Sequence, residues 1–329
     1  MMNQLIADFT SHLKEAITVG KQTKFENTDQ SILNVLVCGL GGSGIGGTII
    51  SQLISDQCNV PIVVNKDYHI PSFVNQDTLV ICCSYSGNTE ETIKMYEQAV
   101  DKGAIVSIIT SGGKFADLAE ENELNIIKIR GGFPPRAAFG LSFPQLFFTF
   151  NQYGLIDDSF IAEIEQSIST IDSEEENMQV EAKAVAEKLF GKFPIIYSEA
   201  SMEGVATRFR QQINENGKML CSHHAIPEMN HNELVGWRTE NQDLAVVYLR
   251  SEEDYYRNQA RMEQNKEVIN QYVSSITEIY SKGNSKIERA LYLIHLCDWA
   301  SELVAQLKGI DSVEVDVITG LKNMLGELD

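Results

Sequence analysis

The sequence predicts an α/β fold in which parallel sheets are covered by helices on both faces. Short, apolar, β-branched runs alternate with longer segments of helical period, an order typical of parallel strands joined by crossover helices. The alternation occurs in two halves, separated by an acidic segment of helical period. The chain has 329 residues, 43% of them apolar, which is enough for two separate cores. We predict one domain over residues 1–155 and a second over residues 156–329.

The first half contains five predicted strands. Residues up to about 30 are expected to form a helix and a polar connector, and a buried strand follows at 35–38. A glycine-rich segment at 39–47 comes next, and a helix is expected from Thr48. The four remaining strands are predicted at 61–64, 79–83, 104–109 and 124–129.

The second half begins with the acidic segment at 157–189, which is predicted to be a helix that connects the halves. The triple glutamate at 174–176 inside it is expected to form a solvated face. Glu203 is expected to form ion pairs with Arg208 and Arg210 along a later helix. Three strands and two long closing helices are predicted at 193–198, 244–249, 275–280, 286–307 and 312–328.

The strongest functional signal lies between the strand at 79–83 and a following helical run. This strand-to-helix turn directs backbone N–H groups and a positive helix terminus at one spot, which suits a phosphate. Three hydroxyls and a glycine lie in the turn: Ser84, Ser86, Thr89 and Gly87. An ordinary capping box, with Asn88 as the cap and Glu91 three residues later, is the alternative interpretation. The capping box would not explain the spacing of the serines.

A second phosphate signal follows the first strand. Gly39, Gly41 and Gly44 match the dinucleotide fingerprint, which also requires an acidic residue about 20 positions later. This chain has an Asn-Lys pair there, at 65–66. Ser43 inside the glycine segment, together with the later hydroxyl-rich turn, favours one phosphate held between two loops over a dinucleotide.

Charge and cysteine content limit the partners and the compartment. The net charge of −20 and the pI near 4.7 argue against nucleic acid as a partner, because a phosphate-rich polymer would be repelled, although a local site can still bind a small phosphate ester. The first residues lack the basic and apolar regions of a signal peptide, and no apolar run is long enough to span a membrane. The six cysteines form no CxxC pair, so we predict reduced thiols and a cytoplasmic protein.

Segments in both halves resemble a known family. GGSG at 41–44 and SYSGNT at 84–89 resemble the sugar isomerase (SIS) domain. PRA at 135–137, NENGK at 214–218, PEMNHNE at 227–233 and LK at 321–322 resemble, in this order, the bifunctional phosphoglucose/phosphomannose isomerases. The resemblance covers nearly the whole chain. It implies two SIS-type three-layer αβα domains, a homodimer with the active site at the subunit junction, a sugar-phosphate substrate, and neither metal nor cofactor.

The resemblance also implies roles for individual residues. The phosphate would be bound by Gly42, Ser43, Ser84, Ser86 and Thr89. Arg136 would stabilise the enediolate near C1 and C2, and Glu215 would be the catalytic base. His231 of the neighbouring subunit would open the sugar ring with Lys322 as its partner. The family often has proline around 313–315, where this chain has Val-Glu-Val, so the tail that carries Lys322 departs from the family pattern.

The chemistry of aldose–ketose isomerisation requires these residue types. A carboxylate must move a weakly acidic proton between C1 and C2, and a cation must stabilise the oxyanion of the enediolate. A histidine, with its near-neutral pKa, suits the opening of the cyclic sugar. Glucose 6-phosphate and mannose 6-phosphate differ only at C2 and share one enediol, so a single site can serve both.

Other interpretations remain open from the sequence. Glu215 could be a surface glutamate near a helix end, Lys322 a solvated lysine, and His223 or His224 could replace His231. The chain could also be a non-catalytic sugar-phosphate sensor, or an SIS isomerase for another sugar phosphate. A metal-dependent isomerase built on the histidines and glutamates of 223–233 is a further alternative, although their spacing matches no HxH or HExxH pattern.

Overall fold

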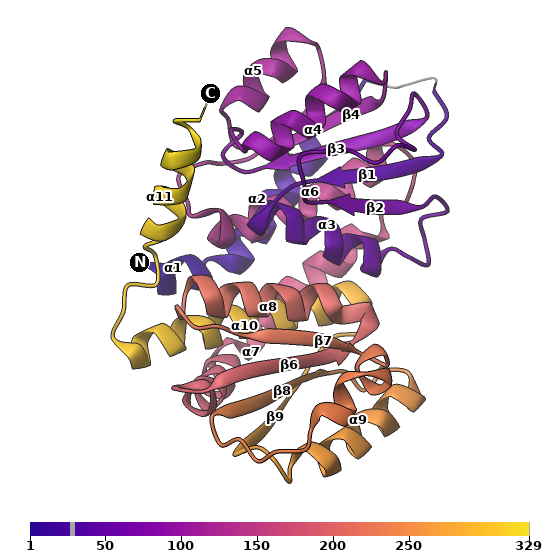
Figure 1. Ribbon diagram of the computed structural model, residues 1–329. Coiled ribbons are helices and arrows are strands. Elements are labelled where there is room, and N and C mark those ends of the chain that lie inside the picture. The colour runs from indigo at the N-terminus through magenta and orange to yellow at the C-terminus, as the bar shows by residue number, and fades with distance from the viewer. Residues whose placement is uncertain (27–29, 329) are drawn as a thin grey trace.

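The computed structural model describes residues 1–26 and 30–328 and contains two parallel sheets with helices on their faces (Figure 1). This confirms the predicted α/β class. The first sheet has the order β2-β1-β3-β4-β5, and the second has the order β7-β6-β8-β9. The strands of the first sheet are β1 (Asn34–Cys38), β2 (Ile62–Asn65), β3 (Thr78–Ser84), β4 (Ile105–Thr110) and β5 (Asn125–Lys128). Those of the second are β6 (Phe193–Glu199), β7 (Ser222–Ile226), β8 (Leu244–Arg250) and β9 (Ser275–Tyr280).

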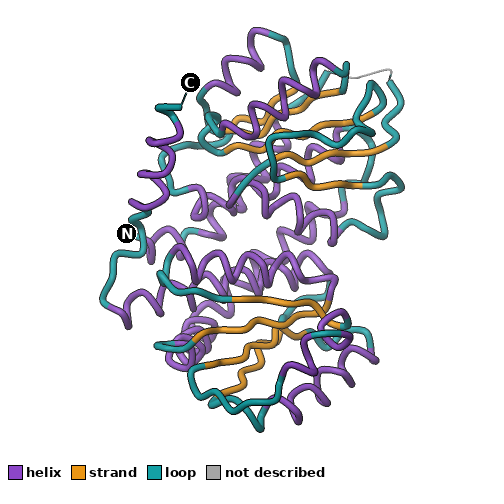
Figure 2. The backbone as a smooth tube through the Cα atoms, viewed as in Figure 1, coloured by secondary structure: helices purple, strands orange, loops and turns teal. Residues whose placement is uncertain are grey.

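Helices fill the space between the two sheets and cover their outer faces (Figure 2). In the first half they are α1 (Met2–Ala7), α2 (Phe9–Gln22), α3 (Gly41–Leu53), α4 (Glu90–Asp101), α5 (Lys114–Glu121), the 3₁₀ turn η1 (Pro135–Ala138) and α6 (Phe139–Gln152). In the second half they are α7 (Ser159–Leu189), η2 (Ala200–Met202), α8 (Glu203–Glu215), η3 (Glu228–His231), η4 (Glu233–Gly236), α9 (Tyr256–Ile269), α10 (Lys286–Lys308) and α11 (Asp316–Leu325).

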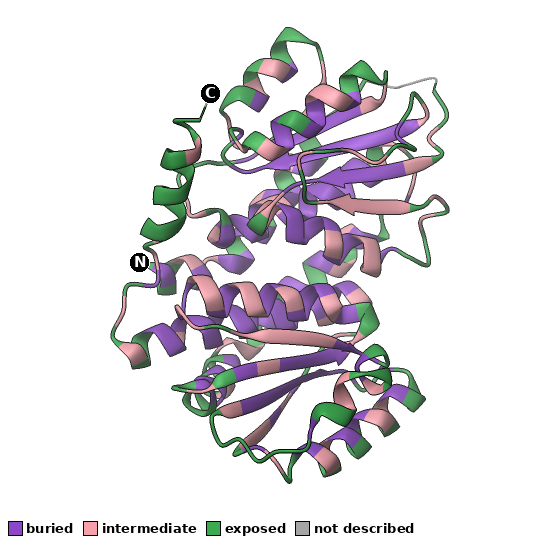
Figure 3. Cartoon of the chain, viewed as in Figure 1, coloured by how far each residue is buried: buried purple, intermediate pink, exposed green. Residues whose placement is uncertain are grey.

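One hydrophobic core runs through both halves. Buried side chains are concentrated in the strands and in the helices between the sheets (Figure 3). Helix α3 of the first half packs against α8 of the second, and the long helix α7 packs along α10. The largest buried cluster includes residues of both sheets, such as Val37 and Val247. Because the halves share this core, the division into domains at residue 155 stays a prediction.

Every strand predicted from the sequence is present, and one further strand, β7, was missed. Its residues, Ser-His-His-Ala-Ile, lack the apolar run that marked the others. The first three are only half-buried, because β7 lies at the edge of its sheet and only one strand pairs with it. A strand with one neighbour can be polar, and the hydrophobic pattern therefore does not reveal it.

The prediction that a helix begins at Thr48 was wrong, because α3 already begins at Gly41. The glycines are needed for close packing and belong to the helix. A Cβ on Gly44 would lie 2.2 Å from the carbonyl oxygen of Gly39, and one on Gly47 would lie 2.8 Å from Val37 Cγ1. The helix consequently starts directly beside β1, and its first turn faces the end of the sheet.

The triple glutamate at 174–176 does not form a solvated face throughout. Glu175 Oε2 lies 2.6 Å from His295 Nε2, and its Oε1 accepts a hydrogen bond from Trp299 Nε1 at 2.9 Å. Glu174 accepts a hydrogen bond from Lys282. The packing of α7 against α10 brings these partners together, and no local sequence pattern contains that information.

In the part of the chain that the structure describes, no helix has the length and apolar character to cross a membrane.

Candidate active site

The two predicted phosphate segments meet at the carboxyl edge of the first sheet. Helix α3 follows β1, and α4 follows β3, and these two strands are neighbours in the sheet. The chain continues from β1 through α3 to β2 at one edge of the sheet, and from β3 through α4 to β4 in the opposite direction, so the strand order reverses between β1 and β3. Ligands of parallel α/β sheets bind at such a switch point. The amino ends of α3 and α4 therefore face one location.

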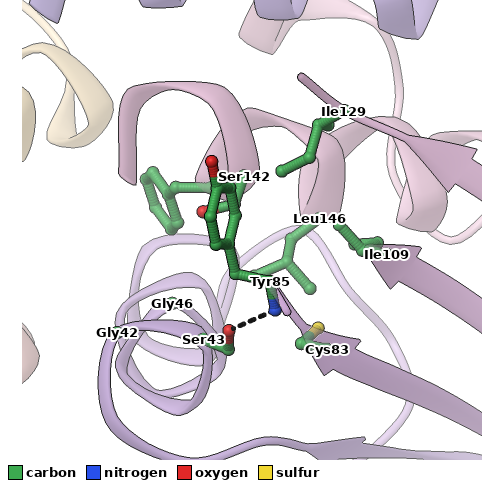
Figure 4. A pocket seen from close by; sticks show the side chains of 10 residues that line it. Gly42, Ser43, Gly46, Cys83, Tyr85, Ile109, Ile129, Ser142 and Leu146 are labelled. Atoms are coloured by element: carbon green, nitrogen blue, oxygen red, sulfur yellow. Dashed lines mark hydrogen bonds between the residues drawn. The ribbon is translucent and has the colours of Figure 1, made fainter. Parts of the chain in front are cut away.

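The hydroxyl groups at this edge retain hydrogen atoms that can be donated to an anion. Ser43 Oγ accepts a hydrogen bond from the backbone N–H of Tyr85 at 3.1 Å (Figure 4), and Ser86 Oγ accepts one from Asn88 at 3.2 Å. Ser84 Oγ accepts a hydrogen bond from the N–H of Gly87 and lies 2.8 Å from Thr89 Oγ1. Because these oxygens serve as acceptors, the hydrogens of Ser43, of Ser86 and of one member of the Ser84–Thr89 pair remain free to donate.

The capping box that was considered for this turn does not form. The N-cap of α4 is Thr89, and no side chain caps the helix. Asn88 instead accepts a hydrogen bond through Oδ1 from the backbone N–H of Lys114 at 2.9 Å. The uncapped amino end of α4 leaves backbone N–H groups available to an anion.

Ser43 and Tyr85 are among the residues that line a small cavity of about 10 Å³, whose lining side chains are shown in Figure 4. Its lining is largely apolar and includes Cys83, Ile109 and Leu146. A cavity of this size has room for about one water molecule, so it is a packing defect behind the loops and no site for a sugar.

Arg136 joins the first half of the chain to the second. It lies on η1, next to the start of α3, since a Cβ on Gly42 would lie 3.4 Å from the backbone N of Arg136. The side chain is only 4% exposed. Its Nε donates to Asn216 Oδ1 at 2.7 Å, and its Nη1 donates to Glu215 Oε2 at 3.3 Å. Burial lowers the pKa of Arg136, and the Glu215 carboxylate opposes that shift.

The second guanidinium nitrogen of Arg136 holds the segment before α11. Nη2 donates to the carbonyl oxygens of Ser312 at 2.6 Å and of Val313 at 3.1 Å. These carbonyls continue the backbone towards α11, so the predicted helix at 312–328 begins only at Asp316. Arg136 thus joins its own segment to two others that are far away in the sequence, 215–216 and 312–313.

Glu215 is the last residue of α8 and is partly exposed beside Arg136. A carboxylate at the carboxyl end of a helix opposes the helix dipole, and the Arg136 charge offsets this cost. Asn216, which follows, is buried and donates through Nδ2 to Ser301 Oγ at 2.9 Å. Lys218 donates through Nζ to the backbone carbonyl oxygens of Glu215 and Glu314. These contacts hold the Glu215 backbone while its carboxylate remains accessible.

Arg208 does not pair with Glu203, so that prediction was wrong. Its Nη2 lies 2.6 Å from Asp298 Oδ2 and donates to the backbone carbonyl oxygen of Arg136 at 3.2 Å. Arg208 faces the core side of α8, where Asp298 of α10 is the nearest carboxylate. It therefore supports Arg136 from behind.

His231 and Lys322 lie apart from this group in the single chain. Helix α8 ends, with Glu215, at the amino edge of the second sheet, and η3, with His231, follows β7 at the carboxyl edge. The five residues of β7 separate the two edges by roughly 16 Å. His231 is exposed, and so is Lys322 on α11. Among the described contacts, neither side chain reaches Glu215 or Arg136.

The adjacent histidines point to different elements. His223 Nε2 lies 2.9 Å from Thr207 Oγ1 on α8, whereas His224 Nδ1 lies 2.8 Å from Glu233 Oε2 in η4. Successive side chains of a strand point to opposite faces, so the two rings diverge.

Sequence reasoning missed the roles of Asn216, Lys218 and the backbone of residues 312–314. Asn216 and Lys218 lie in the NENGK run that was noted without roles for its other members. The carbonyl acceptors at 312–314 could not be predicted from the sequence, because every residue has a backbone carbonyl oxygen.

The chain is similar in sequence to sugar-phosphate isomerases. A family model, the bacterial phospho-glucose isomerase C-terminal SIS domain, matches residues 178–325. A bifunctional phosphoglucose/phosphomannose isomerase of Caldicellulosiruptor bescii is 38% identical over 99% of both chains. One of Aquifex aeolicus is 35% identical over 88% of this chain and 90% of its own. A D-glucosamine-6-phosphate 4-epimerase of Sulfolobus acidocaldarius is 29% identical over 64% of this chain and 66% of its own.

Solved structures share the fold at low sequence identity. The C-terminal domain of glucosamine-fructose-6-phosphate aminotransferase from Francisella tularensis has a TM-score of 0.77, with 13% identity over 95% of this chain and 98% of its own. Glucosamine-6-phosphate deaminase from Thermotoga maritima has a TM-score of 0.68, with 14% identity over 94% of this chain and 96% of its own.

Proposed function

The chain belongs to the family of bifunctional phosphoglucose/phosphomannose isomerases, and we propose that it interconverts glucose 6-phosphate and mannose 6-phosphate with fructose 6-phosphate. It is an isomerase of the SIS type. The observation that carries the proposal is the pairing of buried Arg136 with Glu215 beside the hydroxyl-lined edge of the first sheet.

The arrangement supports a mechanism through a cis-enediol. The phosphate would be held by Gly42, Ser43, Ser84, Ser86 and Thr89, which would extend the sugar towards Arg136. Glu215 would remove the proton from C1 or C2 and return it to the other carbon. Arg136 would stabilise the enediolate oxygen with a fixed charge. Return of the proton to either face of C2 would produce the glucose or the mannose epimer.

The ring-opening groups require a second copy of the chain. His231 lies across the second sheet from Glu215, so we propose that the active site forms at the junction of a homodimer and takes His231 from the partner. Lys322 would assist the histidine from α11. We also propose that the enzyme is cytoplasmic, which its six free thiols support. The proposed domains are 1–155, with the phosphate loops, and 156–329, with Glu215.

Another sugar phosphate as the substrate is the second candidate, and one observation favours it. The relative from Sulfolobus acidocaldarius is named for epimerisation of an amino-sugar phosphate at C4. The phosphate loops alone do not distinguish between these substrates. A non-catalytic sensor would need no base, so the accessible carboxylate of Glu215 would have no catalytic role in it.

Substrate turnover tests the proposed function. Purified, chelator-treated protein is expected to form fructose 6-phosphate from glucose 6-phosphate and from mannose 6-phosphate, each measured separately. Because both sugars share one enediol, both should react. Turnover of amino-sugar phosphates alone would favour the second candidate. If neither sugar reacts but either raises the melting temperature, the chain is a sensor and the catalytic assignments fall.

Mixing two inactive variants tests whether His231 is supplied by the partner. We expect Glu215→Gln and His231→Ala to be nearly inactive alone, and their mixture, after subunit exchange, to regain about one quarter of wild-type activity. Half of the mixed dimers contain both variants, and each of these has one intact site of two. Each variant exchanged with itself is the control. No recovery, although mass measurements show mixed dimers, would place both residues in the site of one chain.

A further inference from the structure

A buried serine on α10, Ser301, belongs to a series of hydrogen bonds that leads to Arg136. Arg136 Nε donates to Asn216 Oδ1 at 2.7 Å, and Asn216 Nδ2 donates to Ser301 Oγ at 2.9 Å. Ser301 Oγ donates in turn to the backbone carbonyl oxygen of Asp298 at 2.7 Å. Asn216 and Ser301 are both 0% exposed. Water therefore does not reach these two side chains, and each depends on its protein partners.

The hydrogen atoms in this series have one possible arrangement. The Nε of an arginine can only donate, so the oxygen of the Asn216 amide must face Arg136. The hydroxyl of Ser301 has a single hydrogen, which is donated to the Asp298 carbonyl, so its oxygen accepts from the amide nitrogen. Both ends therefore require the same orientation of the Asn216 amide. Ser301 fixes the amide at its nitrogen, and Arg136 binds it at its oxygen.

The same turn of α10 also holds the backbone of Arg136. Asp298 Oδ2 lies 2.6 Å from Arg208 Nη2, which donates to the carbonyl oxygen of Arg136 at 3.2 Å. Gln212 Nε2 donates to the other carboxylate oxygen of Asp298 at 2.9 Å. The Arg208 guanidinium lies over the ring of Phe139, with 4.1 Å between Cζ and the ring centroid. Arg136 is thus connected to one turn of α10 both through its side chain and through its backbone.

Within the described residues, one guanidinium nitrogen of Arg136 retains a hydrogen for a ligand. Nε donates its single hydrogen to Asn216. Nη2 donates its two hydrogens to the carbonyl oxygens of Ser312 and Val313. Nη1 also has two hydrogens, and Glu215 Oε2, at 3.3 Å, accepts one of them. The Glu215 side chain is 28% exposed, so the remaining hydrogen of Nη1 lies beside a carboxylate that solvent reaches.

We propose that Ser301 is a positioning residue of the isomerase, which orients the Arg136 guanidinium through Asn216 so that Nη1 faces the substrate. The inference rests on the proposed function. The carbonyls of 312–313 hold one nitrogen of this planar group, and a second fixed nitrogen is needed to set the direction of the third. Ser301 has no described hydrogen bond to Arg136 itself, so it acts through the amide. Without the serine hydroxyl, the amide is free to move at its nitrogen, and Nη1 is no longer aligned with the enediolate oxygen.

Removal of the serine hydroxyl tests the proposal. We expect Ser301→Ala to lower kcat for glucose 6-phosphate by roughly tenfold, because a small misplacement of the charge weakens its contact with the transition state. KM should stay within about twofold, since the phosphate loops are unchanged. The matched control is Ser167→Ala on α7, whose serine is 1% exposed and donates to the carbonyl oxygen of Glu163 at 2.8 Å. It removes an equally buried helix hydroxyl and should leave kcat within about twofold of wild type.

A second background separates positioning from a general effect on the fold. In an Arg136→Met chain, Ser301→Ala should change kcat by less than about twofold, because the group that the serine orients is absent. A serine that only supports the fold would lower kcat by the same factor in both backgrounds. Equal factors, or wild-type kcat in a folded Ser301→Ala variant, would overturn the proposal. If Ser301→Ala does not fold, Ser301→Cys replaces it, because a thiol has a similar shape but is a weaker hydrogen-bond partner.

The Nε–H group of Arg136 gives a readout that does not depend on activity. Its NMR signal is identified by its absence from Arg136→Met. Hydrogen exchange of this signal should be at least about tenfold faster in Ser301→Ala and unchanged in Ser167→Ala. An unchanged exchange rate in Ser301→Ala would show that the serine does not hold the guanidinium, and would overturn the proposal. A wild-type chain that turns over neither sugar would refute the proposed function, and the exchange rate alone would then decide whether Ser301 holds Arg136.

Discussion

Replacement of Glu215 by Gln is expected to reduce kcat by about 10³-fold for both glucose 6-phosphate and mannose 6-phosphate. Glutamine has nearly the same shape as glutamate, and its amide oxygen can still accept the hydrogen bond that Arg136 Nη1 donates at 3.3 Å. The amide cannot take a proton from carbon. The substitution therefore removes the base and leaves the local structure in place. The measurement is steady-state formation of fructose 6-phosphate, beside the melting temperature of the variant.

A matched control lies on the same helix. Glu203 begins α8, twelve residues before Glu215, and Glu203→Gln removes a carboxylate far from Arg136. This variant should keep kcat within about twofold of wild type, since only a small helix-dipole contribution is lost. A correctly folded Glu215→Gln variant with the kcat of the wild type would exclude Glu215 as the base. Glu215 would then be an ordinary surface glutamate at a helix end.

Replacement of Arg136 by Met is expected to lower both stability and activity. The change leaves Asn216 Oδ1, the carbonyls of Ser312 and Val313, and the Glu215 carboxylate without their donor. Loss of one partner from such a buried charged group costs about 3–5 kcal/mol of unfolding free energy. Loss of the enediolate-stabilising charge should lower kcat by a further factor of about 10²–10³. Denaturant unfolding and activity at a temperature where the variant is folded separate the two effects.

Arg130→Met is the control for this substitution. Arg130 is an exposed arginine whose side chain pairs with Glu15 at the surface, and its loss should cost less than about 1 kcal/mol. An Arg136→Met variant that unfolds as the wild type does would contradict the anchoring role of the guanidinium. Retained activity would contradict its role in catalysis.

The sequence predicted the fold well where local pattern determines structure. Eight of the nine strands in the described residues were predicted, because buried parallel strands are continuous apolar runs. The edge strand β7 was missed because its first three residues are polar and only half-buried, so they form no apolar run. The start of α3 was misplaced because glycine usually indicates a loop, whereas here Gly44 and Gly47 allow a helix to approach β1 closely.

The candidate site was only partly accessible from the sequence. The hydroxyl turn is a local motif, and its residues lie at one edge of the sheet as expected. The partners of Arg136 are long-range, since Asn216 and the carbonyls of 312–313 reach it only through tertiary packing. The same holds for Arg208, whose partner is on α10 and not on its own helix. The assignment of roles to individual residues stays a prediction until the variants are measured.

The anchoring of Arg136 by Ser312 and Val313 has a consequence for protein synthesis. A ribosome makes the phosphate loops first, and Glu215 when two thirds of the 329 residues have been joined. The guanidinium still lacks two of its acceptors until residue 313 has emerged. A nascent chain, or a product of premature termination after Asn216 and before Ser312, therefore carries every polar side chain of the candidate phosphate site, but its Arg136 can be held only by Glu215 and Asn216. The activity proposed for Arg136 and Glu215 is therefore expected only from chains that include residues 312 and 313.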